Sequence, residues 1–109
     1  MEYATAEYVP VFKALSDETR LRIIDILSCG PLCACDLLEE FSISQSTLSY
    51  HMRILTSSGL IHAQKDGSWT RYSLDQDRLT AVKAFLQIIT SDKADCVCHT
   101  RKGKQNSCC

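Results

Sequence analysis

The sequence lacks the features of an exported or membrane-bound protein. None of its apolar stretches approaches the length that spans a bilayer, and its first ten residues, MEYATAEYVP, contain no basic segment followed by an apolar run. We therefore expect no membrane anchor, no signal peptide and a cytoplasmic location. The chain also lacks internal repeats. Its 109 residues predict one globular domain with a modest core, too short for an enzyme with a second domain.

A strong net charge is also missing, since twelve basic residues nearly balance thirteen acidic ones and leave −1. Such a balance, taken alone, argues weakly against nucleic-acid binding. The distribution of charge argues for it. Residues 1–43 contain eight acidic and three basic side chains, whereas residues 44–74 contain three basic and one acidic side chain, with His51 and His62 in addition. A dimer would double this basic segment, and we expect modest, salt-sensitive DNA binding.

Cysteine, by contrast, is abundant, with seven residues. The number is odd and no export signal is visible, which argues against a disulfide scaffold. We therefore expect reduced thiols whose role is metal binding or redox sensing.

The stretch 31–59 predicts two short helices joined by a turn. Ser44 is a good N-cap for the second helix, and Gly59 is a natural stop after it. Apolar residues recur at helical spacing along that helix, at Leu48, Met52 and Leu55. The helix before it has a shorter apolar stripe, formed by Ala34, Leu37, Leu38 and Phe41. This pattern is typical of a helix-turn-helix, whose second helix enters the major groove of DNA.

The other face of the second helix carries hydrogen-bonding groups. We expect four of them to reach base edges or phosphates: Gln45, Ser46, Thr47 and Ser49. Tyr50 and Arg53 are better suited to positioning the helix on the DNA backbone. Each of these side chains could instead belong to a solvated helix face. His51 is expected to pack or to contact phosphate, and His62 to be structural.

Two further helices are predicted before this motif. The first has Pro10 in its first turn and buries Tyr8, Val11, Phe12 and Leu15. Ser16 caps the second, which ends at Gly30-Pro31. It faces inward through Leu21, Ile24 and Leu27, and Ile23 and Ile26 broaden this stripe. Arg20 is expected at the surface, where it contacts the DNA backbone or pairs with a neighbouring carboxylate.

A hairpin and a last helix are predicted after the motif. Strands at 60–65 and 68–74 flank Asp66-Gly67, a strong turn signal, and a hairpin directly after a recognition helix is a wing. Lys65 and Arg71, on either side of the turn, suit phosphate or minor-groove contact, and Trp69 shares that role or packs at the base of the wing. The last helix, from about 77 to 90, has an apolar face wider than one small core requires, with Leu79, Val82, Leu86 and Ile89 along it.

The predicted fold class is therefore mainly α with a β-hairpin wing, a winged helix-turn-helix that forms a homodimer. It spans 1–91, and a polar, flexible, cysteine-containing tail follows at 92–109. Part of the last helix is expected to pack against the second subunit.

Several local strings resemble the ArsR/SmtB family of winged-helix transcriptional repressors. They are FKALSDETRLRI at 12–23, LCACDL at 32–37, QSTLSYHMRIL at 45–55 and SGLI at 58–61, and the resemblance extends from about 9 to 89. It implies a homodimer with the first and last helices at the interface. It also implies operator binding without ligand and release when a metal or metalloid binds. The Cys-x-Cys-Asp-Leu string resembles arsenic- and antimony-responsive members, and relatives that sense lead or cadmium.

The sequence departs from the arsenic-sensor pattern at one position, because Leu38 stands where a third cysteine is usual. A third ligand would then come from the tail, through Cys96, Cys98, Cys108 or Cys109. The family's zinc site on the last helix is expected to be absent, since no histidine falls between Asp75 and Thr90.

Trivalent arsenic and antimony are soft and bind thiolates, typically three. Cys33 and Cys35 are two residues apart, a rotation of ~200° on a regular helix, so they can share one ion only if the backbone there is not helical. Gly30-Pro31 favours such an extended start. We expect ligation to distort the first helix of the motif and thereby move the recognition helix.

Other interpretations of the thiols stay open at this point. Cys33 and Cys35 could be two small, half-buried side chains, and the tail thiols could be merely reactive. The Cys96-Val97-Cys98-His99 spacing could suit zinc or cadmium, but no second pair completes a set.

The leading hypothesis is a repressor, not an enzyme, that needs no cofactor and is induced by arsenite or antimonite. An organic trivalent arsenical, cadmium or lead is an alternative inducer, and a thiol-redox repressor is a further alternative. A thiol enzyme is disfavoured because the pair follows a helix and a Gly-Pro stop rather than a strand and an anion-binding loop.

Overall fold

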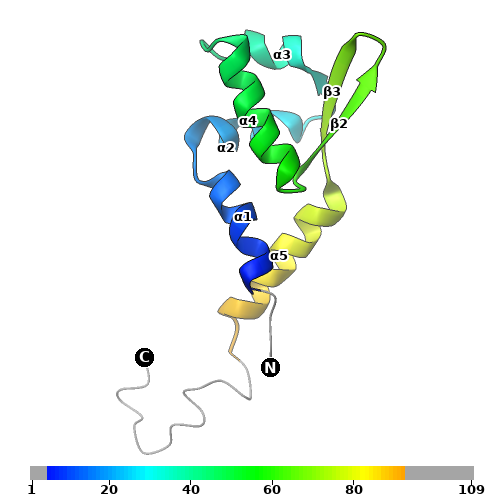
Figure 1. Ribbon diagram of the computed structural model, residues 1–109. Coiled ribbons are helices and arrows are strands. Elements are labelled where there is room, and N and C mark those ends of the chain that lie inside the picture. Colours follow the sequence, from blue (N-terminus) through cyan, green and yellow to red (C-terminus); the bar gives the residue numbers. More distant parts are fainter. Residues whose placement is uncertain (1–4, 93–109) are drawn as a thin grey trace, which may run out of the picture.

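The computed structural model describes residues 5–92, which form helices and one small sheet (Figure 1). In chain order these are α1 (Thr5–Leu15), α2 (Glu18–Leu27), β1 (Leu32–Cys33), α3 (Ala34–Glu39), α4 (Gln45–Ser57), β2 (Ile61–Asp66), β3 (Trp69–Leu74) and α5 (Gln76–Thr90). The predicted fold class, mainly α with a β-hairpin wing in a winged helix-turn-helix, is confirmed. The tail beyond residue 92, with its four cysteines, lies outside the described residues, so the division of the chain at 91 stays a prediction. Within them, no helix is long and apolar enough to cross a membrane.

The helix-turn-helix, α3 and α4, forms as the sequence predicts. Ser44 caps α4, since its hydroxyl accepts a hydrogen bond from the Thr47 amide at 3.1 Å. Leu48, Met52 and Leu55 are at most 2% exposed and join Leu37 of α3 in the core. Gly59 follows the helix with φ +85°, a left-handed conformation that favours glycine.

The wing is the hairpin β2–β3, with a turn one residue later than predicted. Asp66 pairs with Trp69, so the turn consists of Gly67 and Ser68 rather than Asp66 and Gly67. The reason is that Gly67 takes the left-handed position, with φ +66°, while Asp66 stays extended and paired.

A third strand, β1, was not predicted. It pairs antiparallel with β3 through Leu32 opposite Tyr72 and Cys33 opposite Arg71, which gives the sheet the order β1-β3-β2. Two residues carry no alternation of polar and apolar side chains, so the sequence offers no strand signal here. This short ladder joins the start of α3 to the wing.

Two expectations for the first helices were wrong. Helix α1 begins at Thr5, so Pro10 lies in its second turn rather than its first. Proline has no N–H to donate to the carbonyl of Ala6, and both residues are exposed, so water can satisfy that carbonyl. Helix α2 is capped by Asp17, whose carboxylate accepts from the Arg20 amide, rather than by Ser16. Ser16 instead donates to the carbonyl of Lys13 at the end of α1.

The inward face of α2 differs from the prediction at Leu21, while Ile24 and Ile26 pack against the core as expected. Ile23 and Leu27 are buried, whereas Leu21 is 50% exposed and Ile24 is half-buried. The true stripe follows the i, i+4 spacing of Ile23 and Leu27, and an isoleucine-rich helix offered several such stripes.

Helices α1 and α5 lie side by side at the end of the molecule away from the wing (Figure 1). Tyr8 of α1 stacks on Phe85 of α5 with ring centroids 4.2 Å apart, and Glu7 pairs with Arg78 at 3.6 Å. Val82 and Phe85 are the buried residues of α5, whereas Leu86 and Ile89, further along the predicted apolar face, are 41% and 39% exposed. Large apolar side chains remain exposed on both helices: Val9, Leu86, Ile88 and Ile89.

Candidate thiol site and nucleic-acid interface

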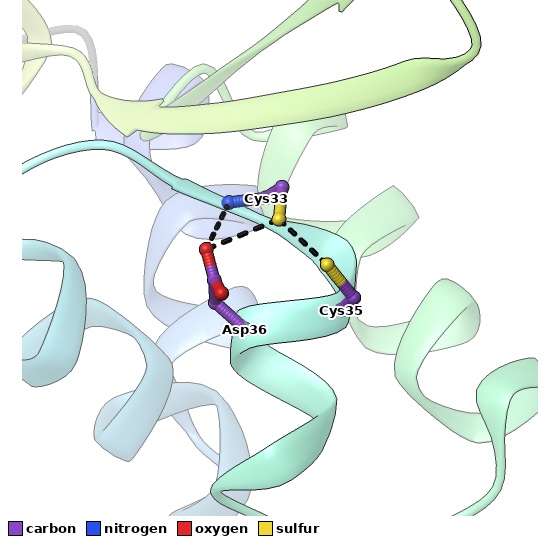
Figure 2. A group of neighbouring side chains, drawn as sticks. All are labelled: Cys33, Cys35 and Asp36. Carbon is purple, nitrogen blue, oxygen red and sulfur yellow. Dashed lines mark hydrogen bonds between the residues drawn. The ribbon is translucent and has the colours of Figure 1, made fainter.

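Cys33 and Cys35 meet at the junction between β1 and α3 (Figure 2). Cys33 is the last residue of the strand and the N-cap of the helix, with extended backbone (φ −86°, ψ 166°). Cys35 lies in the first turn of α3. Because the two cysteines have different backbone conformations, their sulfurs point toward each other and lie 2.8 Å apart. The extended start expected from Gly30-Pro31 is confirmed, and one soft atom can reach both sulfurs.

Asp36 completes the cluster. Its carboxylate accepts hydrogen bonds from the Cys33 thiol at 3.1 Å and from the Cys33 amide at 3.3 Å (Figure 2). The thiol donor, then the amide donor and the nearby charge of Arg71, hold the pKa of the Asp36 carboxyl below its usual value. Sequence analysis did not select Asp36, although a carboxylate three residues after an N-cap is a known capping pattern that could have identified it.

The protons of the two thiols can be assigned from this geometry. Cys33 has one S–H and directs it at Asp36, so the hydrogen between the sulfurs belongs to Cys35. This hydrogen bond to Cys33 is the main reason why the pKa of the Cys35 thiol is raised above its ordinary value. At neutral pH Cys35 is therefore a thiol, and a ligand must displace its proton.

The donor set favours a soft element. Cys33, Cys35 and Asp36 offer ligand atoms within 4.8 Å of one another, and they form the single group of this kind in residues 5–92. Two sulfurs suit trivalent arsenic or antimony, cadmium or lead, whereas a structural zinc site requires four well-placed ligands. The tail thiols that we expected to supply a further ligand, Cys96, Cys98, Cys108 and Cys109, lie outside the described residues.

Two cavities adjoin the thiols. One, of about 400 Å³, lies between α3, α4 and β3 and is lined by Cys35 and Leu38, among others. The other, of about 230 Å³, lies between the two cysteines and three wing residues, Asp66, Trp69 and Arg71. Trp69 is 59% exposed and stands next to the hairpin turn, so the alternative that it packs at the base of the wing was wrong.

The side chains predicted to touch DNA all lie on exposed positions of α4 and the wing: Gln45, Ser46, Thr47, Ser49, Tyr50, Arg53, Lys65 and Arg71. They do not form one uniform surface. The hydroxyls of Ser46 and Thr47 hydrogen-bond the Ser44 cap, at 3.1 and 2.9 Å, and so hold the first turn of α4. Gln45 and Ser49 border the larger cavity beside the thiols.

Arg53 and Arg71 border two different cavities. Arg53 borders a separate cavity of about 400 Å³ together with Lys13 and Arg20. Arg71 borders the thiol cavity, directly opposite Cys33 in the sheet. The wing arginine is therefore a neighbour of the thiol site as well as a predicted DNA contact.

The two histidines are structural in this arrangement. His51 is 9% exposed, and its Nδ1 lies 3.0 Å from a guanidinium nitrogen of Arg20. Since guanidinium only donates, Nδ1 must accept, which places the ring proton on Nε2. Arg20 also donates to the carbonyl of Ala14 at 2.6 Å and so ties α1 and α2 to α4, a role that sequence analysis missed. His62 contacts the carboxylate of Asp75, the N-cap of α5, at 3.0 Å.

Comparisons with known proteins agree with this architecture. Residues 17–63 match the family model described as "Bacterial regulatory protein, arsR family". The chain is 44% identical to the arsenical resistance operon repressor of Staphylococcus xylosus and 46% identical to that of Staphylococcus aureus, each over 96 residues, or 88% of this chain and 92% of theirs. It is also similar to the solution structure of a homodimeric winged helix-turn-helix DNA-binding domain from Mycobacterium bovis, a possible ArsR-family regulator. That similarity has a TM-score of 0.66 at 25% identity and covers 78% of this chain and 79% of the other.

Proposed function

Because this chain belongs to the ArsR family of bacterial transcriptional repressors, we propose that it binds operator DNA as a homodimer and releases it when thiolates capture trivalent arsenic or antimony. Members of this family are DNA-binding regulators rather than enzymes. The proposal includes a cytoplasmic location, where operator DNA is found, and an arsenic-type inducer, in keeping with the names of the two staphylococcal relatives.

One observation carries the choice of inducer. The sulfurs of Cys33 and Cys35 lie 2.8 Å apart at the junction between β1 and α3, with the Asp36 carboxylate 3.1 Å from the Cys33 sulfur. A soft trivalent element bonds to sulfur in preference to oxygen, so Cys33 and Cys35 are its natural ligands. The tail thiols Cys96, Cys98, Cys108 and Cys109 are proposed to supply the third sulfur where the element takes three.

The position of the thiols explains how capture reaches the DNA-binding surface. Cys33 belongs to a ladder with β3 of the wing, and Cys35 belongs to α3, which packs through Leu37 into the same core as α4. A ring closed through both sulfurs fixes the angle between strand and helix. An inducer favours release only if it binds the released geometry more tightly than the DNA-bound one. We propose that the ring selects a wing and helix arrangement that no longer fits the groove.

The homodimer is proposed to form through α1 and α5. Both helices carry exposed apolar side chains, Val9 on α1 and Leu86, Ile88 and Ile89 on α5. Both helices lie at the end of the molecule away from the wing (Figure 1), so pairing there would leave both recognition helices free. A dimer of this kind also doubles the number of basic groups offered to the DNA.

The proposal is tested by a titration of protein bound to its operator DNA with arsenite and antimonite, using the intact chain and the double variant Cys33→Ser/Cys35→Ser. We expect the variant to bind DNA but to remain bound when arsenite is added. The matched control is Cys29→Ser, an exposed cysteine outside the cluster, which should respond like the unmodified chain. Continued release of the double variant would refute the role of this pair.

The same titration separates the alternatives. Release by cadmium or lead but not by arsenite would identify a divalent-metal sensor. Release by peroxide without any added metal would identify a thiol-redox repressor.

A further inference from the structure

Leu38 occupies the place of the missing third sulfur. It follows Cys35 by three residues on α3, so the two side chains lie on neighbouring positions of one helix face. Both line the cavity of about 400 Å³ between α3, α4 and β3. A ligand held by the two thiols therefore has a carbon surface and open space beside it where a sulfur is usual.

Trivalent arsenic forms three bonds, and Cys33 and Cys35 provide two of them. The third bond can therefore carry a substituent that occupies the open space beside the thiols. An arsenical with one organic substituent, R–As(OH)₂, needs no third sulfur. Each thiol forms one As–S bond while one As–O bond breaks, and the thiol proton leaves with the hydroxide as water. The product is a dithiolate R–As(SR′)₂ with two waters released, and arsenic stays trivalent, so no oxidant or reductant is involved.

The shape of the cavity selects the substituent. Its volume lies within the range of about 300–1,000 Å³ that is usual for small-molecule sites. The residues that line it include Trp69 and Tyr72 of β3 and the nearly buried Leu48 and Met52 of α4, together with polar residues such as Gln45, Ser49 and Thr70. A methyl group would leave most of this space empty, whereas an aromatic ring would contact both α4 and the wing. Flat aromatic side chains are favourable partners for such a ring.

We propose that the Cys33–Cys35 site takes monoaryl trivalent arsenicals, with the arsenic bonded to the two thiols and the aromatic ring seated in the cavity between α3, α4 and β3. This inference rests on the proposed function and narrows its inducer class. The seated ring would also touch Gln45 and Ser49, two of the side chains predicted to read DNA. Occupancy of the cavity would therefore act on the recognition helix directly.

The test compares phenylarsonous acid, methylarsonous acid and arsenite by calorimetric titration. The protein is the full chain with Cys29 and the four tail cysteines changed to serine, so that Cys33 and Cys35 are the remaining thiols. A peptide of residues 31–38 carries the same two thiols without the cavity and gives the intrinsic preference of the chemistry. We expect the phenyl-to-methyl affinity ratio of the protein to exceed that of the peptide by at least about tenfold.

Two variants locate the effect. Trp69→Ala removes an exposed cavity wall and should return the ratio close to that of the peptide while leaving arsenite affinity unchanged, which also shows that the thiol site is intact. Leu38→Cys restores a third sulfur and should raise arsenite affinity while lowering the preference for phenyl. Leu21→Ala, on an exposed position of α2 that borders neither thiol cavity, is the matched control and should change nothing.

Equal ratios in protein and peptide, or a ratio unmoved by Trp69→Ala, would overturn the cavity inference and leave the proposed function standing. Failure of all three arsenicals to bind Cys33 and Cys35 would instead overturn the proposed function itself.

Discussion

Cys33 and Arg71 are direct partners across the antiparallel ladder between β1 and β3. Opposed residues of a ladder present their side chains on the same face of the sheet, and both line the cavity of about 230 Å³ beside Cys35. The Asp36 carboxylate is held in its charged form first by the Cys33 thiol and, to a smaller extent, by Arg71. The thiol site and the wing are therefore parts of one structure.

This pairing leads to a prediction for Arg71→Ala. If Arg71 contacts a DNA phosphate in the repressing state, its loss should weaken operator binding and reduce the slope of log K against log salt by about 0.9 for each phosphate contact removed. Arsenite stoichiometry should not change, because the sulfurs remain. Measurement of affinity at several salt concentrations checks this. Lys65→Ala is the control on the neighbouring strand, since Lys65 borders neither thiol cavity, and it should change the salt slope without altering the response to arsenite.

The second prediction concerns pH and distinguishes a metalloid from a metal. The pKa of the Cys35 thiol is raised from its ordinary value, chiefly by its hydrogen bond to Cys33, so this thiol is protonated at neutral pH. Arsenous acid removes that proton as water with its own hydroxyl group, so its affinity should be nearly constant between about pH 6 and about pH 8. Cadmium must release the proton to solvent, so its affinity should rise at least about tenfold for each pH unit in that range.

Titrations at three pH values with each inducer provide the measurement. Below its pKa, the Cys35 thiol of the free protein holds a proton that cadmium must displace. A rise in pH therefore increases the affinity for cadmium until the pKa of this thiol is reached. A steep pH dependence of arsenite binding would contradict the assigned thiol protonation.

The fold could be predicted from the sequence where all the local signals indicated the same helix. The Ser44 cap, the Leu48, Met52 and Leu55 stripe and the stop at Gly59 all indicate the same helix, and the structure agrees. In α2 the isoleucines fit several inward faces, and only packing against α1 and α4 selects Ile23 over Leu21.

The two cysteines of the candidate site could be predicted from the sequence, but the residues that surround them could not. The Cys-x-Cys spacing and Gly30-Pro31 pointed to a shared ligand held by extended backbone. Nothing in the local sequence places Arg71 or Trp69 beside Cys33, because that proximity depends on the β1–β3 ladder, a long-range pairing of only two residues in β1.

The third prediction concerns Arg20, which joins three helices. Arg20→Ala removes the donor to the Ala14 carbonyl and the hydrogen bond to Nδ1 of the buried His51, which then has only the Asp17 carboxylate at 3.9 Å. Groups left unsatisfied in this way cost about 1–3 kcal/mol, so we expect a loss of that order in the free energy of unfolding. Denaturant unfolding checks it. Arg22→Ala is the control, since the Arg22 guanidinium stacks 4.8 Å from the Phe41 ring and should contribute about 0.5–1 kcal/mol.

The last prediction concerns the apolar face of α5. Leu86 and Ile89 are one helical turn apart, and their side chains are 41% and 39% exposed. Exposure of such large apolar side chains to water is unfavourable, and nothing in the described part of the same subunit covers them. A partner α5 would bury them, and a carboxylate at either position would then lie unpaired in the interface. We expect Leu86→Asp and Ile89→Asp to shift the protein to monomers in sedimentation measurements. Operator affinity should fall as well, since each subunit would bind one half-site alone. Leu21→Asp, at a comparably exposed position on α2, should remain dimeric, and a monomer in that control, or dimers in both α5 variants, would place the interface elsewhere.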